Sequence, residues 1–193
     1  EALVEAAMQA GIPRNPDFNG RVQEGTGFYQ TTTSKTRRYS TAVAYLKPAR
    51  ARGNLVVTAN AHATRIVIED GRATGIEYRT PQGYMRATAR REIVVSGGVY
   101  GSPQLLQLSG VGPGALLQGL GIPVVRDMAA VGANLHDHFN TYCAFRCTKA
   151  ITYNDIYASW WKQGVAAIDY VLRGKGALTG NGIFAGAFVR SDP

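Results

Sequence analysis

The residues Ser96-Gly97-Gly98 form the first group in this sequence whose types and spacing could do chemistry. They follow the continuous apolar run Ile93-Val94-Val95, which is typical of a strand buried on both faces of a parallel sheet. Ligands of open α/β sheets bind beyond the carboxyl ends of the strands, where glycine lets a nucleotide approach the main chain. A tight strand-to-helix turn needs glycine equally, so both interpretations stand. No GxGxxG or GxxxxGKS/T motif accompanies the group.

The run His136-Asp137-His138 invites a metal-binding or acid–base interpretation. Alternating histidines can chelate a metal ion, and a histidine beside an aspartate can act as an oriented base. A metal site needs further ligands, however, and no other Cys, His or carboxylate cluster lies at a recognisable spacing; His62 is the only other histidine. The sequence therefore predicts neither a metal ion nor a catalytic residue here.

The cysteines and the largest aromatic residues suggest structural roles. Cys143 and Cys147 lie four residues apart on an alternating segment, which places them on one face of a strand as buried free thiols rather than a redox pair. So few cysteines favour a reducing compartment, here the cytoplasm. Trp160, Trp161 and Tyr170 could wall a substrate pocket, but aromatic residues on an amphipathic helix more often pack in a core.

Composition excludes several classes of protein. With 193 residues, 45% of them hydrophobic, the chain can bury a core, and no stretch approaches the roughly 18 apolar residues of a membrane-spanning helix. The 21 basic residues exceed the 13 acidic ones, giving a net charge of +8. These basic residues are scattered and not interleaved with aromatics, so we expect a solvated basic face or phosphate attraction and no nucleic-acid partner.

Hydrophobic patterning and turn signals indicate an α/β (α+β) fold in which an antiparallel meander feeds a buried strand of a doubly wound sheet. A boundary falls near residue 139, after which an alternating strand and an amphipathic helix follow. The expected helices cover residues 1–10, 41–48, 102–110, 115–120 and 159–174, and the expected strands cover 54–60, 63–70, 73–80, 85–95, 122–125 and 140–148.

Five stretches together resemble the glucose–methanol–choline oxidoreductase family, in particular its choline dehydrogenase-like and alcohol dehydrogenase-like branch. They are NPDFNGRVQEGTGFYQ, TRRYSTAVAYLKPA, NLVVTANAHATRIVIEDGRATGIEY, ARREIVVSGGVYGSPQLLQLSGVGP and LGIPVVRDMAAVGANLHDH, in the family's order. The resemblance implies that residues 1–139 are the C-terminal part of an FAD-binding domain, without its GxGxxG strand-loop-helix. It implies further that residues 140–193 begin a substrate-binding domain.

The resemblance also assigns cofactor-binding positions. It places the main chain of Ala63 against the FAD adenine and Ser96-Gly97-Gly98 near the ADP ribose. Asn134, Asp137 and His138 match a run that approaches the flavin, in which the Asp accepts backbone hydrogen bonds. The stretch after Gly97 reads Gly98-Val99-Tyr100-Gly101 instead of the Ala-Ile-Asn common in relatives. We expect this difference to change the packing of the turn rather than its role.

The family's catalytic histidine region has no counterpart here, so the chain is expected to be an internal fragment, inactive and not retaining FAD by itself. Its parent would transfer a hydride from a primary alcohol to flavin N5, forming an aldehyde. An oxidase or a lyase on the same scaffold is an alternative, as is a non-catalytic basic module that binds nucleic acid.

Phe184 indicates which alcohol the parent oxidises, because the resemblance places it where choline dehydrogenases carry an acidic residue. Its loss favours a neutral, rather apolar primary alcohol over choline. The electron acceptor stays undetermined, and the parent could associate peripherally with a membrane. We also expect the fragment to self-associate through an apolar sheet edge that lacks its neighbouring strand.

Overall fold

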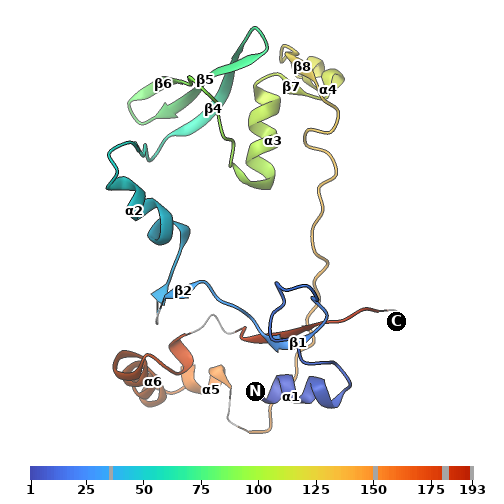
Figure 1. Ribbon diagram of the computed structural model, residues 1–193, viewed down its shortest axis with the longest axis vertical. Coiled ribbons are helices and arrows are strands. Elements are labelled where there is room, and N and C mark those ends of the chain that lie inside the picture. The colour runs from blue at the N-terminus through green and yellow to red at the C-terminus, as the bar shows by residue number, and fades with distance from the viewer. Residues whose placement is uncertain (35–36, 150–151, 180–182, 192–193) are drawn as a thin grey trace. The chain divides into compact units, whose positions relative to one another are not determined.

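The computed structural model describes residues 1–34, 37–149, 152–179 and 183–191. The chain divides into two units (Figure 1). Val56–Cys143 form the central unit, and Glu1–Leu55 together with Ala144–Pro193 form the split unit. The end of the central unit lies close to the expected boundary near residue 139, but the N-terminal residues join the C-terminal segment. The assignment of these segments to a cofactor domain and a substrate domain stays a prediction.

The elements of the split unit are α1 (Ala2–Gln9), β1 (Gly25–Phe28), β2 (Thr33–Ser34), β3 (Arg37–Arg38), the π-helix η1 (Ala42–Leu46), α2 (Lys47–Arg50), α5 (Tyr153–Tyr157), α6 (Trp160–Arg173), the 3-10 helix η2 (Ala177–Thr179) and β9 (Ala185–Phe188). Those of the central unit are β4 (His62–Glu69), β5 (Arg72–Thr80), β6 (Gly83–Thr88), α3 (Gly98–Leu108), β7 (Val111–Gly112), α4 (Gly114–Gly119) and β8 (Arg126–Asp127).

The central unit is built on the antiparallel meander β4-β5-β6 (Figure 1). Its first turn uses Asp70 at φ 51° and Gly71 at φ 75°, the two positive φ angles that a tight hairpin turn requires. Helix α3 packs on β4, and the main-chain N–H of Ile66 donates to the Ser109 hydroxyl at 2.8 Å. Ile66 and Val67 are buried. The meander predicted from the alternating pattern is therefore confirmed.

Helix α4 is the second helix of the central unit and follows β7 in the chain. Its Leu117 has no exposed surface, and the short parallel strands β7 and β8 pair beside it. The N-terminus of α4 is held by Asp127, whose Oδ1 accepts the Gly114 N–H at 2.8 Å. A carboxylate at this end of a helix offsets the unpaired N–H groups there.

In the split unit, β1 pairs with β9 in antiparallel register, with Thr26 opposite Ala187. The Thr26 side chain is 1% exposed, and its hydroxyl donates to the Gly186 carbonyl. On the other edge of β1, the Asn15 N–H donates to the Thr26 carbonyl at 2.8 Å. Strand β1 is thus paired on both sides, which fixes β9 near the start of the chain.

Helix α6 begins and ends as its sequence predicts. Ser159 accepts a hydrogen bond from the Lys162 N–H at the N-terminus, and Gly174 adopts the left-handed conformation at the C-terminus, where a residue with a Cβ would be strained. Trp160 and Trp161 extend from the first turn and are 82% and 66% exposed. Neither ring is therefore buried in a core of this unit.

Helix α5 begins with a hydrogen-bonded pair that depends on pH. The Asp155 carboxylate accepts from the Thr152 hydroxyl at 2.6 Å and from the Thr152 N–H at 2.8 Å. These bonds, the hydroxyl first, hold the pKa of Asp155 below its ordinary value. Because the folded pKa is the lower one, the pair stabilises the helix start above the unfolded pKa and is lost as pH falls through the folded pKa.

We expect the substitution Thr152→Val to raise the pKa of Asp155 toward its ordinary value, because the hydroxyl bond to the charged form is removed. The matched variant Thr179→Val removes a threonine hydroxyl that donates only to the Gly176 carbonyl and should leave this pKa unchanged. An NMR titration of the Asp155 carboxyl carbon measures both. Equal pKa values in the wild type and Thr152→Val would contradict the assignment.

Several predicted elements differ in the structure. Residues 54–60, 89–95, 122–125 and 140–148 form no strands, although the sequence predicts strands there. The side chain of Val94 is 76% exposed, because a strand of the buried type needs neighbours on both edges and the described residues supply none. Pro48 lies in the first turn of α2, where its missing N–H costs little, and so does not end the helix. Cys143 and Cys147 are free, as predicted, but exposed rather than buried.

Candidate functional site

The first turn of α3 presents an open main chain. Gly97 precedes the helix, and its N–H donates to the Ser102 hydroxyl at 3.0 Å. Gly98 adopts a φ of 81°, and a Cβ added there would meet no atom within 4 Å. A positive φ and open space together mean that a ligand can approach this main chain closely, where any other residue would be strained. Ser96, which precedes the two glycines, is exposed.

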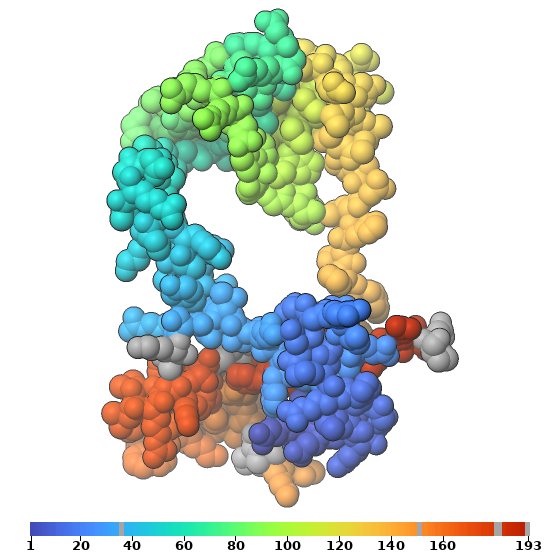
Figure 2. Space-filling view, viewed as in Figure 1, coloured from blue at the N-terminus to red at the C-terminus, as the bar shows by residue number. Residues whose placement is uncertain are grey.

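One face of α3 and the segment 132–136 enclose a pocket of about 480 Å³. The helix contributes Tyr100, Gln104 and Gln107, and the segment contributes Asn134, which itself has a positive φ of 56°. The Gln107 Nε2 donates to the Val131 carbonyl at 3.0 Å and so ties the segment to the helix. The surface of α3 is visible in Figure 2, in light green. The pocket is partly polar, open and next to the glycine pair.

The structure brings together only some of the predicted cofactor residues. Asn134 lines the pocket, and Ser96-Gly97-Gly98 lie at the start of the helix that forms its wall. Ala63 is half-buried on β4 opposite Tyr78 and does not line the pocket. Asp137 and His138 are exposed beyond it, and the Asp137 Oδ1 accepts the His138 N–H at 2.8 Å. Their part in binding a cofactor stays a prediction.

Sequence reasoning missed Tyr100, Gln104 and Gln107. Their spacing of i, i+4 and i+7 places them on one face of a helix that begins at Gly98, whereas the prediction started the helix at Ser102. Within the described residues, no three His, Cys, Asp or Glu side chains gather where they could hold a metal ion. None of the described helices is long and apolar enough to cross a membrane.

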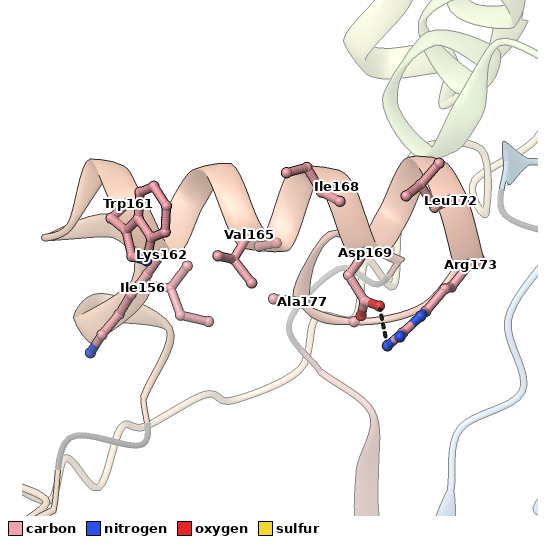
Figure 3. A pocket seen from close by; sticks show the side chains of 11 residues that line it. Ile156, Trp161, Lys162, Val165, Ile168, Asp169, Leu172, Arg173 and Ala177 are labelled. Atoms are coloured by element: carbon pink, nitrogen blue, oxygen red, sulfur yellow. Dashed lines mark hydrogen bonds and ion pairs between the residues drawn. The ribbon is translucent and has the colours of Figure 1, made fainter.

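A larger, mostly apolar groove of about 730 Å³ runs along α6 in the split unit (Figure 3). Trp161, Val165, Ile168 and Leu172 follow one another along the helix at its edge, and all are more than half exposed. At its C-terminal end, Arg173 Nη1 lies 3.4 Å from a carboxylate oxygen of Asp169. Since this pair is exposed, it contributes little to stability.

Phe184 lies in the split unit, directly before β9. Its carbonyl accepts the Tyr29 N–H at 2.9 Å, which continues the β1–β9 pairing by one residue. The Phe184 ring stacks on Tyr153, with centroids 6.4 Å apart and planes inclined by 21°. The ring is 39% exposed. Phe184 is therefore fixed in place and still reachable.

Residues 1–140 match the GMC oxidoreductase family. The chain belongs to this family. It is 45% identical to the oxygen-dependent choline dehydrogenase of Burkholderia thailandensis and 43% identical to that of Pseudomonas entomophila. The first alignment covers 99% of this chain and the second covers all of it, but each covers 34% of the relative. This GMC oxidoreductase chain thus spans about a third of the length of the curated relatives it matches.

Solved structures agree on the fold. An FAD-dependent oxidoreductase from Chaetomium thermophilum superposes with a TM-score of 0.82, covering 94% of this chain and 33% of that one at 23% identity. A formate oxidase gives a TM-score of 0.80 over 95% of this chain and 32% of the other, again at 23% identity. The pyridoxine 4-oxidase of Mesorbium loti is 30% identical, with a TM-score of 0.62 over 66% of this chain and 25% of that one. The α/β GMC oxidoreductase fold predicted from the sequence is confirmed.

Proposed function

We propose that this chain is part of an FAD-dependent GMC oxidoreductase that oxidises a primary alcohol to an aldehyde. The observation that carries the proposal is the open main chain at Gly98, at the start of α3 and beside a partly polar pocket, in a chain of this family. The relatives named as choline dehydrogenases and the neighbour named as FAD-dependent support both the cofactor and the substrate class.

The residues at this site fit the nucleotide part of FAD. An anion or a ribose can approach the main chain at Gly98, where a Cβ would meet no atom within 4 Å, and the first N–H groups of a helix favour negative charge. Asn134 and Gln104 add side-chain amides at the pocket wall. When bound, FAD supplies the hydride acceptor, and the chain's own residues bind and orient its nucleotide. We assign the catalytic base to no residue of this chain.

For the substrate, we propose a neutral, rather apolar alcohol. By the resemblance to choline dehydrogenases, Phe184 takes the position of a carboxylate that would pair with the quaternary ammonium of choline. An aromatic ring can still attract a cation by its face, but this contact is weaker than a charge pair in a desolvated site. The low number of cysteines favours a reducing, cytoplasmic setting for the parent.

The test uses the full-length parent, purified and mixed with FAD. We expect a bound-flavin absorption spectrum that bleaches on anaerobic addition of 3,3-dimethyl-1-butanol, the uncharged isostere of choline. The ratio of kcat/KM for choline to that for the isostere should be below one, and Phe184→Glu should raise it about tenfold. A parent without flavin would overturn the proposed function. Much faster turnover of choline would overturn the substrate assignment alone.

Gly98 offers a sharper test of the cofactor site. We expect Gly98→Val to weaken FAD binding by the full-length protein about tenfold or more, because valine at a positive φ strains the first turn of α3. Gly101→Ala is the matched control, since the added Cβ meets no atom within 4 Å and alanine favours the helix. Fluorescence titration with FAD measures both affinities. Equal weakening in the two variants would contradict the placement of FAD at Gly98.

Self-association of the isolated chain stays a prediction. The apolar run 93–95 supports it, because Val94 is exposed and its two neighbours are only half-buried. Such a run is able to pair with a second copy of itself.

A further inference from the structure

A second pocket of about 390 Å³ lies between α5, α6 and η2, and it shares Ile156, Ala166 and Ala177 with the groove along α6. It is lined by Tyr153, Ile156, Tyr157, Gln163, Gly164, Ala166, Ala167, Ala177 and Leu178. None of these described residues carries a charge. The side-chain amide of Gln163 already donates to the Tyr157 carbonyl at 2.8 Å, so the remaining lining is mainly apolar. This composition and volume are typical of a pocket for a small organic molecule.

Tyr153 links this cavity to Phe184. Its ring lines the cavity and also stacks against the Phe184 ring, 6.4 Å between centroids. Both rings are held from their main chains: Phe184 by the hydrogen bond to the Tyr29 N–H, and Tyr153 by the Thr152–Asp155 pair at the start of α5. The cavity and the position assigned to the substrate therefore share an aromatic wall that the backbone keeps in place.

We infer that the cavity between α5 and α6 binds the hydrocarbon part of the alcohol substrate, with Tyr153 as a specificity-determining residue. The inference rests on the proposed function. An uncharged lining leaves a quaternary ammonium without a counter-ion, whereas each methylene of an alkyl tail gains on burial. The selected substrate class is an alcohol with an aliphatic or aryl tail of a few carbon atoms.

The first test follows kcat/KM of the full-length flavoprotein along the series ethanol to 1-octanol. Burying one methylene is worth about a fourfold gain, so kcat/KM should rise by about that factor per carbon until the cavity is full. Ala167→Phe, which fills the cavity, should abolish the rise of kcat/KM with chain length. Val171→Phe is the matched control, because Val171 lies on the same helix, is 76% exposed and does not line the cavity.

Two variants of Tyr153 test its own role. Tyr153→Phe keeps the ring and should keep the wild-type dependence of kcat/KM on chain length. In Tyr153→Ala this dependence should disappear, because KM no longer falls as the alcohol grows longer, while kcat stays nearly unchanged. A fall in kcat for all alcohols alike would indicate a general structural effect and overturn the specificity role.

A readout without turnover separates this inference from the proposed function. Benzene, which has no hydroxyl to oxidise, should produce saturable NMR shifts at the methyl groups of Ala166, Ala167 and Leu178, and Ala167→Phe should remove them. Benzene binding by a protein that oxidises no alcohol would overturn the proposed function and, with it, the substrate role of the cavity. Alcohol oxidation with an unchanged chain-length dependence in Ala167→Phe, and no shifts at these methyls, would overturn the cavity assignment alone.

Discussion

Replacing Leu117 by alanine is expected to lower the free energy of unfolding of the central unit by about 2–5 kcal/mol. The side chain of Leu117 has no exposed surface, so the substitution removes its burial and leaves a cavity that the surroundings fill only in part. Helix α4 is short and cannot hold its place by helix propensity alone. We therefore expect α4 and the β7–β8 pair beside it to loosen together.

The matched control is Leu120→Ala, at the residue just after α4. Leu120 is 65% exposed, and its truncation should change stability by no more than about 0.5 kcal/mol. Urea unfolding monitored by amide hydrogen exchange in β4 and β5 gives both values for the central unit. If the two variants lost stability equally, Leu117 would not be a core residue.

Gly27→Ala is expected to cost the split unit about 3 kcal/mol, at the upper end of the range for overpacking. A Cβ on Gly27 would overlap the main-chain carbonyl oxygen of Asn15, and this atom cannot rotate away as the end of a side chain can. Strand β1 is paired on both edges. Moving the strand or its neighbour to remove this overlap therefore breaks either the hydrogen bonds to Asn15 or the pairing with β9.

Gly164→Ala serves as the control in the same unit. A Cβ at Gly164 meets no atom within 4 Å, and alanine within a helix gains about 0.5–1 kcal/mol over glycine. Hydrogen exchange at the Thr26 amide should therefore become faster in Gly27→Ala and should be unchanged or slower in Gly164→Ala. Unaltered exchange in Gly27→Ala would show that Asn15 can move aside.

Elements that depend on neighbouring residues could be predicted from the sequence. The Asp70-Gly71 turn is encoded by two residues that tolerate positive φ, and α6 by a serine before it and a glycine after it. The runs 93–95 and 140–147 have the side-chain pattern of strands but no partner among the described residues. Pairing is a property of two segments, which the pattern of one segment does not contain.

The candidate site likewise combines residues that a local sequence signal identifies with contacts between distant segments that no local signal identifies. The sequence points to Ser96-Gly97-Gly98 because glycine at a strand-to-helix junction is a local signal, and the structure places them at the start of α3. The approach of Asn134 to Gln107 depends on a hydrogen bond from Gln107 to a segment more than twenty residues away. The stacking of Phe184 on Tyr153 likewise joins residues far apart in the sequence, and no local sequence pattern predicts either contact.

The pairing of β1 with β9 also sets the order in which the protein can be completed during synthesis. Thr26 bonds to Gly186 across 160 residues, and a ribosome adding about 5–20 residues per second needs roughly 8–32 s to make that length. Among the described residues, the strands of the central unit pair only with one another, so this unit can form within this interval. During this interval the edge of β1 that later pairs with β9 has no partner, so this edge stays exposed until Gly186 has been made.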